Sequence, residues 1–346
     1  MDYFIPILLI IVGLVFIVKG GDWFVDAVMW IAKISHIPSF IIGATLVSLC
    51  TTLPELLVSS FAAAKGSADM AVGNAIGSVT ANTGLILALT LTFAPFTIER
   101  KDYMLRSSLL IGSIALLFGL CATRVLNPWL SLLMFVPLVV FMWDNLKKGK
   151  QHMLARKEAD NVQGVEVVES EEEKELEEAP KKDKKTVITN IVKFIVGVVG
   201  IVWGSDLLVD YASELATLLG ISEGIIAVTI VAIGTSLPEL VTTVTALVKK
   251  DSSLSAGNII GANLIDICLI LPICAIISAA TGATGLPVSL QSMYLDFPFC
   301  LGVSLIALAP ALITKKFRRW QGITMLCAYV AYIVLCILMT KGIIFA

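Results

Sequence analysis

The sequence predicts an all-α polytopic membrane protein with ten transmembrane helices, arranged as two inverted five-helix repeats that contain broken helices. Hydrophobic residues make up 57% of the 346 residues and charged residues only 15%, against about 25% charged in soluble domains. Apolar runs of about 20 residues, the length that crosses a bilayer, recur along the chain. An eleven-residue phrase, CTTLPELLVSS from Cys50, also returns as GTSLPELVTTV from Gly234.

Each predicted span is an apolar run between polar or basic loop ends. The first run is longer than a cleavable signal and lacks the basic start of one. The first five spans form a predicted membrane repeat over residues 1–146, and the last five form a second repeat over residues 187–346. The ten spans are expected at residues 4–31, 38–64, 70–94, 103–122, 127–146, 187–217, 222–248, 254–279, 290–313 and 320–342.

Residues 147–186 separate the two repeats and contain the charged stretch VESEEEKELEEAPKKDKK. Mixed charge and scarce aromatic residues are typical of a solvated linker. An acidic cation sensor is the alternative, but the interspersed lysines and glutamates show no regular ligand spacing. We therefore predict a charged cytoplasmic linker.

The basic residues predict how the chain is oriented in the cell (inner) membrane, because positive loop ends stay on the cytoplasmic side. The opposite loop ends hold only Lys65 and Arg124, with Lys341 near the C-terminus. Both termini are therefore expected outside, with the bilayer as partner and no nucleic-acid partner. The basic loop ends carry Lys33, Arg100, Lys101, Arg106, Lys147, Lys148, Lys249, Lys250, Lys315, Lys316, Arg318 and Arg319.

The repeated phrase belongs to a longer internal repeat with an offset of 184 residues, which relates Glu55 to Glu239. At the same offset, GNAIGSVTAN from Gly73 matches GNIIGANLID from Gly257. Five spans per half is an odd number, so the second half must insert upside down relative to the first. Inverted repeats of this kind build many secondary transporters, with the binding site near the midplane between the halves.

Each copy of the phrase places a proline inside an apolar span, where it removes a helical hydrogen bond. The segments Thr52–Glu55 and Ser236–Glu239 both fit a capping box, in which a hydroxyl begins a new helix. We therefore expect two half-helices in each span, with free carbonyls over residues 48–51 and 232–235. In lipid such carbonyls need partners.

The two glutamates could merely close their own helix caps. However, carboxylates at membrane depth are costly and indicate function by default, and Asn82 and Asp266 align with each other in the neighbouring spans. Carboxylates, an amide, hydroxyls and carbonyls together suit a hard cation such as calcium. The absence of sulfur and imidazole from this set disfavours zinc and copper.

These paired motifs, GTSLPEL with GNIIGANLID and their counterparts in the first half, resemble the sodium/calcium exchangers of the cation/calcium exchanger superfamily. The resemblance covers nearly all of the chain outside the linker. It implies that Glu55 and Glu239 bind the transported calcium with the carbonyls of Thr51 and Thr235. It further implies sodium ligands at Thr52, Ser236, Ser78, the Thr51 and Thr235 side chains and the carbonyls of Ser48 and Ala232, with Asn82 and Asp266 completing the ring.

The chain departs from the family pattern at three places. Cys50-Thr51-Thr52 stands where glycine, threonine and serine are usual, and Ser48 replaces a usual alanine. Ala262 replaces a serine that would be the counterpart of Ser78. The missing hydroxyl leaves the stoichiometry of sodium, and the identity of the counter-ion, open.

The expected function is therefore a secondary antiporter that exchanges calcium for sodium, with no cofactor besides the transported ions and no enzymatic activity. Protons or potassium as counter-ion form the first alternative, because burial favours protonated carboxylates. A cation channel lined by the same oxygens is the second, although broken helices between inverted repeats favour a gated transporter. The aspartate pairs Asp22/Asp26 and Asp206/Asp210 are expected to be interfacial charges, with a gating role as the alternative.

Overall fold

The computed structural model describes residues 3–34, 48–98, 100–147, 183–240, 243 and 252–340. Most of the predicted linker lies outside these residues, as do parts of the predicted spans 38–64 and 222–248. Within the described ranges, eight helices are long and apolar enough to cross a membrane, so the prediction of a helical membrane protein is confirmed. The described parts of the other two predicted spans include the shorter apolar helices Leu53–Ala64 and Glu223–Thr235.

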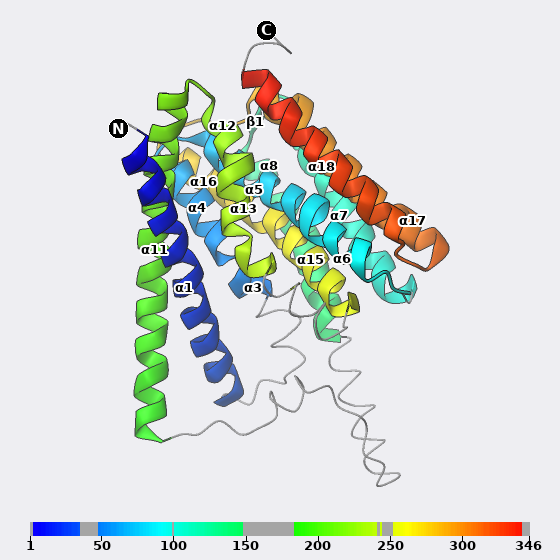
Figure 1. The fold of residues 1–346 in the computed structure, drawn as a ribbon, viewed down its shortest axis with the longest axis horizontal. Coiled ribbons are helices and arrows are strands. Elements are labelled where there is room, and N and C mark those ends of the chain that lie inside the picture. Colours follow the sequence, from blue (N-terminus) through cyan, green and yellow to red (C-terminus); the bar gives the residue numbers. More distant parts are fainter. Residues whose placement is uncertain are drawn as a thin grey trace.

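The first half of the chain contains broken and continuous helices (Figure 1). Asn127 begins the fifth span by accepting hydrogen bonds from the Trp129 and Leu130 amides. That helix continues to residue 147. The elements are α1 (Phe4–Ile34), α3 (Ser48–Thr51), α4 (Leu53–Ala64), α5 (Ala68–Ala81), the π-helix η2 (Asn82–Leu87), α6 (Ala88–Phe93), α7 (Arg100–Leu120), the strand β1 (Val125–Leu126), α8 (Pro128–Ser131) and the 3-10 turn η3 (Leu132–Met134).

The second half contains matching elements, and Asp183 caps its first helix by accepting from the Thr186 amide. A helical turn over residues 237–240 follows α13. The elements are α11 (Lys184–Leu219), α12 (Glu223–Ile226), the π-helix η4 (Ala227–Val231), α13 (Ala232–Thr235), α15 (Ser252–Ile265), the π-helix η5 (Asp266–Ile270), α16 (Leu271–Ala280), the strand β2 (Leu286–Pro287), the π-helix η6 (Ser292–Asp296), α17 (Phe297–Thr314) and α18 (Arg319–Thr340).

The sequence repeat recurs in these elements. Helices α3 and α13 begin 184 residues apart, as do α5 and α15, and the π-helices η2 and η5 also keep this offset. A π-helix inserts one residue into a helical turn and is often found at functional sites. Equivalent helices of the two halves are therefore distorted at equivalent positions.

The centre of the molecule is formed by α5 with its continuation and by α15 with α16. In the spans Ala68–Phe93 and Gly257–Ala280, 78% and 83% of the most apolar stretch is buried, against 17–39% in the other six. The outer helices expose large apolar side chains such as Phe4, Trp129 and Val330. Because a bilayer surrounds such helices with hydrocarbon, these exposed faces are consistent with lipid contact.

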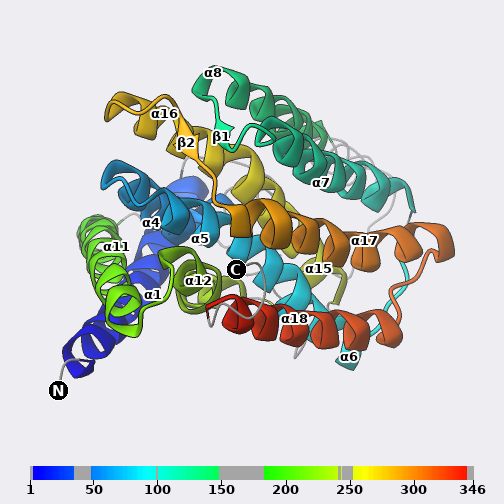
Figure 2. The same ribbon diagram turned by 90° about the horizontal axis from the view of Figure 1, so that it is seen from above.

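Helices α1 and α11 lie side by side at one edge of the molecule (Figures 1 and 2). Their backbones come close at glycines: a Cβ atom at Gly20 would lie 2.8 Å from the carbonyl oxygen of Gly197, and one at Gly13 would lie 2.9 Å from that of Gly204. Small residues permit such close packing. In membranes this packing stabilises helix pairs, because lipid tails are as apolar as the side chains and the hydrophobic effect does not drive helices together. We call these two helices the α1–α11 pair.

The two ends of the molecule can be told apart by the chain direction. Helix α1 begins and α18 ends at the same end, whereas α11 begins at the opposite end (Figure 1). At the end where α1 begins and α18 ends, β1 and β2 pair antiparallel, with Val125 opposite Pro287. This short sheet joins the two halves.

Candidate functional site

The broken helices bring Glu55 and Glu239 into the interior. Glu55 lies in the first turn of α4, directly after Pro54, and Glu239 lies in the turn that follows α13. Both side chains are only 1% exposed. The proline does interrupt each span as predicted, and it leaves a carboxylate at the interruption.

The predicted capping box at Thr52 is wrong. The Thr52 side chain makes no cap to the new helix, and its hydroxyl instead donates to the carbonyl of Ser48 at 2.6 Å. The Thr52 amide also donates to this carbonyl at 3.2 Å, so helical bonding continues across much of the break. A threonine hydroxyl in a helix commonly finds the carbonyl one turn back, and that bond prevails here.

The carbonyls that the breaks were expected to free are partly engaged. Ser48 also accepts from the Thr51 hydroxyl at 3.2 Å. In the second half, Ala232 accepts from the Ser236 amide at 3.1 Å and from the Thr235 hydroxyl at 3.3 Å. The equivalent hydroxyls of Thr51 and Thr235 therefore donate to equivalent carbonyls in both halves, within each broken helix.

Several hydrogen bonds join polar groups of the two halves at this depth. The Ser236 hydroxyl donates to Glu55 Oε1 at 3.1 Å, and the Thr235 hydroxyl donates to Asn74 Oδ1 at 3.3 Å. Asn74 Nδ2 in turn donates to the backbone carbonyl of Glu55 at 3.3 Å. The repeated motifs thus meet at one place, although their residues are far apart in the sequence.

A further bond between the halves runs from the Ser48 hydroxyl to Asn258 Oδ1, at 3.0 Å. Ser48 is one of the departures from the family pattern, and its counterpart in the other half is Ala232. Alanine has no side-chain hydroxyl, so residue 232 cannot make the equivalent bond in the second half.

Asn82 and Asp266 lie at equivalent positions, each at the first residue of a π-helix. Both are 1% exposed. Asp266 interacts electrostatically with Glu239, and Glu55 interacts with both of these carboxylates. The Thr51 side chain bonds to the Glu239 carboxylate. Three acidic side chains therefore share one buried region.

Several buried oxygens in this region have no hydrogen-bond partner among the described residues. They are Glu55 Oε2, Ser78 Oγ, Asn82 Oδ1 and both carboxylate oxygens of Asp266. Leaving a buried polar oxygen without a partner is costly. An oxygen-binding cation would satisfy these atoms.

Within the described ranges, no group of three or more His, Cys, Asp and Glu side chains is arranged to hold a metal by itself. A cation here would therefore need hydroxyl, amide and carbonyl oxygens beside the carboxylates. Such mixed oxygen sets suit hard cations, calcium included.

The sequence reasoning missed three buried or partly buried polar residues in this region. Asn74, Asn258 and Asn263 all lie in the repeated GN motifs or next to them, and the recurrence of GN in both halves is the signal for the first two. Asn263 donates to the Thr83 hydroxyl at 2.8 Å, and its Oδ1 has no described partner. It follows Ala262, which is fully buried.

A fourth buried carboxylate, Asp296, lies outside this cluster. It accepts hydrogen bonds from Tyr332 at 2.9 Å, from Ser292 at 3.0 Å and from Gln291 at 3.4 Å. Three neutral donors satisfy the carboxylate, so it holds η6 against α18. No repeated motif marked this position in the sequence.

Comparison with known proteins gives a consistent result. The sequence model of the family described as "Sodium/calcium exchanger protein" matches residues 5–146 and 189–338. The sodium/calcium exchanger MaX1 of Methanosarcina acetivorans is 32% identical over 94% of this chain and 97% of its own length. The inner membrane protein YrbG of Escherichia coli is 34% identical over 78% of this chain and 79% of its own length.

A solved structure is also similar. It is the sodium-calcium exchanger NCX_Mj, soaked with 10 mM Na+ and 10 mM Sr2+. The TM-score is 0.62 at 26% sequence identity, and the match covers 95% of this chain and 97% of that one.

Proposed function

Because the chain belongs to the sodium/calcium exchanger family, we propose that it moves calcium out of the cytoplasm while sodium enters, by alternating access of one buried site. Membership in this family makes the chain an ion transporter and not an enzyme. The relatives MaX1 and NCX_Mj carry sodium and calcium in their names, which supports these two ions as the substrates.

One observation carries the proposed site. Glu55, Glu239 and Asp266 are buried together, and in the described part of the chain no lysine or arginine forms an ion pair with Glu55 or Asp266. Buried charges of one sign are costly without a compensating charge. Bound cations would supply that charge, which supports a site that is occupied through most of the transport cycle.

We assign the individual ligands from the resemblance of the two repeated motifs to those of the family. Calcium lies between Glu55 and Glu239, with the carbonyls of Thr51 and Thr235. Sodium binds around them through hydroxyl and carbonyl oxygens, with Asn82 and Asp266 completing the ring. The sodium ligands are Thr51, Thr52, Thr235, Ser236, Ser78, and the carbonyls of Ser48 and Ala232. Because calcium and sodium compete for one carboxylate cluster, each must leave before the other binds, and this competition enforces exchange.

The inverted repeat explains how one site could open to either side. Elements of the two halves keep a constant offset, and hydrogen bonds between the halves meet at the glutamates. Two related halves of opposite orientation can exchange their roles, which closes one side and opens the other. We propose that the ten spans form two such five-helix repeats, residues 1–146 and 187–346.

A proton or potassium counter-ion remains the second candidate, and Ala262 favours it because the second half lacks the hydroxyl that Ser78 provides in the first. Calcium uptake into proteoliposomes tests both, with sodium, potassium and pH gradients imposed separately. Uptake driven by the sodium gradient alone supports the proposal. Uptake that responds only to potassium or pH overturns sodium coupling, and uptake that needs no ion on the trans side indicates a channel.

A further inference from the structure

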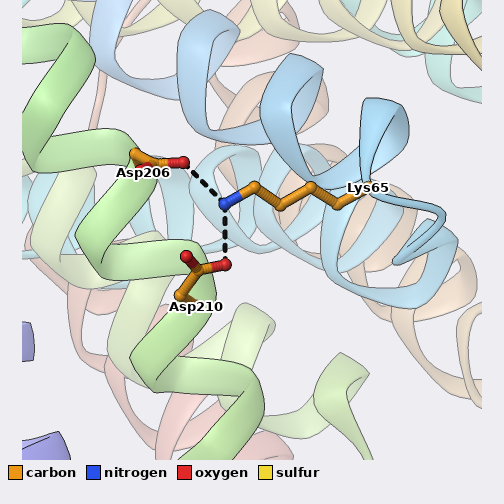
Figure 3. Close-up of polar contacts among 3 residues, drawn as sticks. All are labelled: Lys65, Asp206 and Asp210. Atoms are coloured by element: carbon orange, nitrogen blue, oxygen red, sulfur yellow. Dashed lines mark hydrogen bonds and ion pairs between the residues drawn. The ribbon is translucent and has the colours of Figure 1, made fainter.

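The α1–α11 pair is tied to the helix that carries Glu55 by one lysine. Lys65 directly follows α4, and its Nζ lies 2.6 Å from Asp206 Oδ1 and 2.6 Å from Asp210 Oδ1, both on α11 (Figure 3). The two aspartates are one helical turn apart, so one ammonium group reaches both. We call this arrangement the Lys65 bridge.

The Lys65 bridge differs from the other charged contacts of the pair. Lys193 of α11 lies 2.7 Å from Asp26 of α1, and Lys19 lies 3.7 Å from Asp22 within α1. Both of these ion pairs hold groups inside the α1–α11 pair. The Lys65 bridge instead joins the pair to α4, one of the two broken helices.

The rest of the contact between the pair and the broken helices includes apolar packing. Leu14 of α1 packs against Gly234 of α13, next to Thr235 of the proposed site. Contacts between apolar surfaces are non-directional, so they permit one helix to shift along another. An ion pair with two short bonds depends strongly on position. The Lys65 bridge is therefore more sensitive than such apolar contacts to movement of the pair along α4.

The protonation of Lys65 supports a persistent contact. Burial alone would lower the pKa of Lys65, but its hydrogen bonds with Asp206 and Asp210 raise the pKa above the ordinary value of 10.5. Lys65 therefore keeps its charge at neutral pH. Glu55 and Lys65 stand at the two ends of the same twelve-residue helix, so α4 links the bridge to the proposed site.

We propose that Lys65 is a positioning residue of the exchange cycle, whose bridge to Asp206 and Asp210 must break when the α1–α11 pair moves relative to the site. This inference rests on the proposed alternating access. The bridge holds the conformation described above, and its release belongs to the conformational step, not to ion binding.

Exchange kinetics test the inference through Lys65→Met, which keeps the length of the side chain but removes its charge. We expect a maximal rate of sodium-driven calcium exchange about threefold or more above wild type, since partly exposed ion pairs have effects of this modest size. The half-saturating concentrations of both ions should stay unchanged. Lys65→Arg should keep the wild-type rate.

Three further variants sharpen the test. The double variant Asp206→Asn/Asp210→Asn should match Lys65→Met, and the triple variant should add nothing, because interacting residues are non-additive. Lys193→Met is the matched control, since it removes an ion pair of similar length and exposure inside the α1–α11 pair. An unchanged or lower maximal rate for Lys65→Met, or the same gain for Lys193→Met, overturns the inference.

A measurement without transport separates this inference from the proposed function. Spin labels carried by unnatural amino acids at Leu219 of α11 and Trp129 of α8, both exposed, report the distance between the pair and the rest of the molecule. Lys65→Met should broaden or shift this distance distribution, and Lys193→Met should not. An unchanged distance distribution overturns the positioning role of Lys65, even if exchange is observed. Absence of sodium-driven exchange in the wild type counts against the proposed function alone.

Discussion

At the scale of single residues, the two glutamates are the most consequential side chains. Each is buried beside a proline, and each comes from a different half of the chain. Ser236 of the second half donates to Glu55 of the first, so a change in either half alters a shared cluster. This arrangement makes the charge of each glutamate directly testable.

Glu55→Gln or Glu239→Gln alone should abolish calcium exchange while the fold remains intact. Glutamine keeps the size of the side chain but removes the negative charge that a divalent cation needs. The measurement is sodium-driven calcium uptake into proteoliposomes, with folding checked by monodispersity in detergent. Glu214→Gln, at an exposed position of α11, is the matched control. Normal transport by either site variant would refute the two-glutamate site.

Ala262→Ser should raise the apparent affinity for sodium or steepen the sodium dependence, with a smaller change in calcium binding. A neutral hydroxyl matters more for a monovalent ion held by few charges than for calcium held between two glutamates. Ala262 is fully buried, so the new hydroxyl also carries a desolvation cost of about 1–3 kcal/mol if it finds no partner. A sodium titration of calcium efflux measures the effect.

Ala307→Ser is the control for that cost, because Ala307 is equally buried in α17, outside the proposed site. The control should lose stability without a change in sodium dependence. Identical sodium curves for wild type and Ala262→Ser would mean that the missing hydroxyl is immaterial. A response to pH or potassium in place of sodium would favour the other counter-ion.

Single residues also show the limits of sequence reasoning. Glu55, Glu239, Asn82 and Asp266 could be selected from the repeat alone, because costly groups recur at a fixed offset. For Thr52 the predicted helix cap is wrong, since a hydroxyl can either cap the next helix or donate to the preceding turn. Local spacing permits both, and only the three-dimensional arrangement decides between them.

At the scale of elements, the prolines located the interruptions of two spans, but no sequence signal located the π-helices. Asn82 and Asp266 each begin one. A π-helix needs one extra residue in a turn and no special residue type, so hydrophobic periodicity barely registers it. The insertion nevertheless changes which side chains face the site after it.

The α1–α11 packing gives a prediction at the element scale, because two adjacent glycines of α1 have different surroundings. Gly20→Ala should destabilise the protein, since its Cβ would lie 2.8 Å from the Gly197 carbonyl oxygen and 2.9 Å from the Ile201 nitrogen. Backbone atoms cannot yield without separating the helices. Gly21→Ala meets nothing within 4 Å and should be neutral or stabilising by up to about 1 kcal/mol.

Thermal unfolding in detergent measures the contrast. The melting temperature of Gly20→Ala should fall by several degrees, whereas that of Gly21→Ala should not fall. The two variants share helix propensity and position along α1, so the comparison isolates the helix contact. Equal melting temperatures would show that the pair does not depend on close backbone approach at Gly20.

At the scale of the whole molecule, composition predicted the membrane protein and the repeat predicted its two halves. The described ranges support eight long spans, and the matching offsets of their elements agree with the repeat. How the halves pack could not be predicted, because it depends on contacts between distant residues. The burial of α5 and α15 at the centre, and the position of α1 and α11 at one edge, are contacts of that kind.

The orientation follows from charge and from the ends of the helices together. Helix α1 begins and α18 ends at one end of the molecule, and α11 begins at the other (Figure 1). Basic residues Arg100, Lys315 and Lys316 belong to the loop ends that we assign to the cytoplasm. The isolated bridge between Thr97 and Lys316 brings two of these loop ends together. We therefore expect both termini outside and the linker inside the cell.

The linker itself should be cytoplasmic and largely dispensable. A single cysteine placed in residues 162–182 should resist an impermeant thiol reagent in sealed right-side-out cells and react after permeabilisation. Deletion of most of residues 162–182 should leave the rate of calcium exchange and its sodium dependence unchanged, because this segment has no counterpart in either membrane repeat. A deletion that ends before Asp183 keeps the residue that caps α11. Labelling in sealed cells would contradict the orientation, whereas loss of transport after deletion, with normal folding in detergent, would favour a cation-sensing linker.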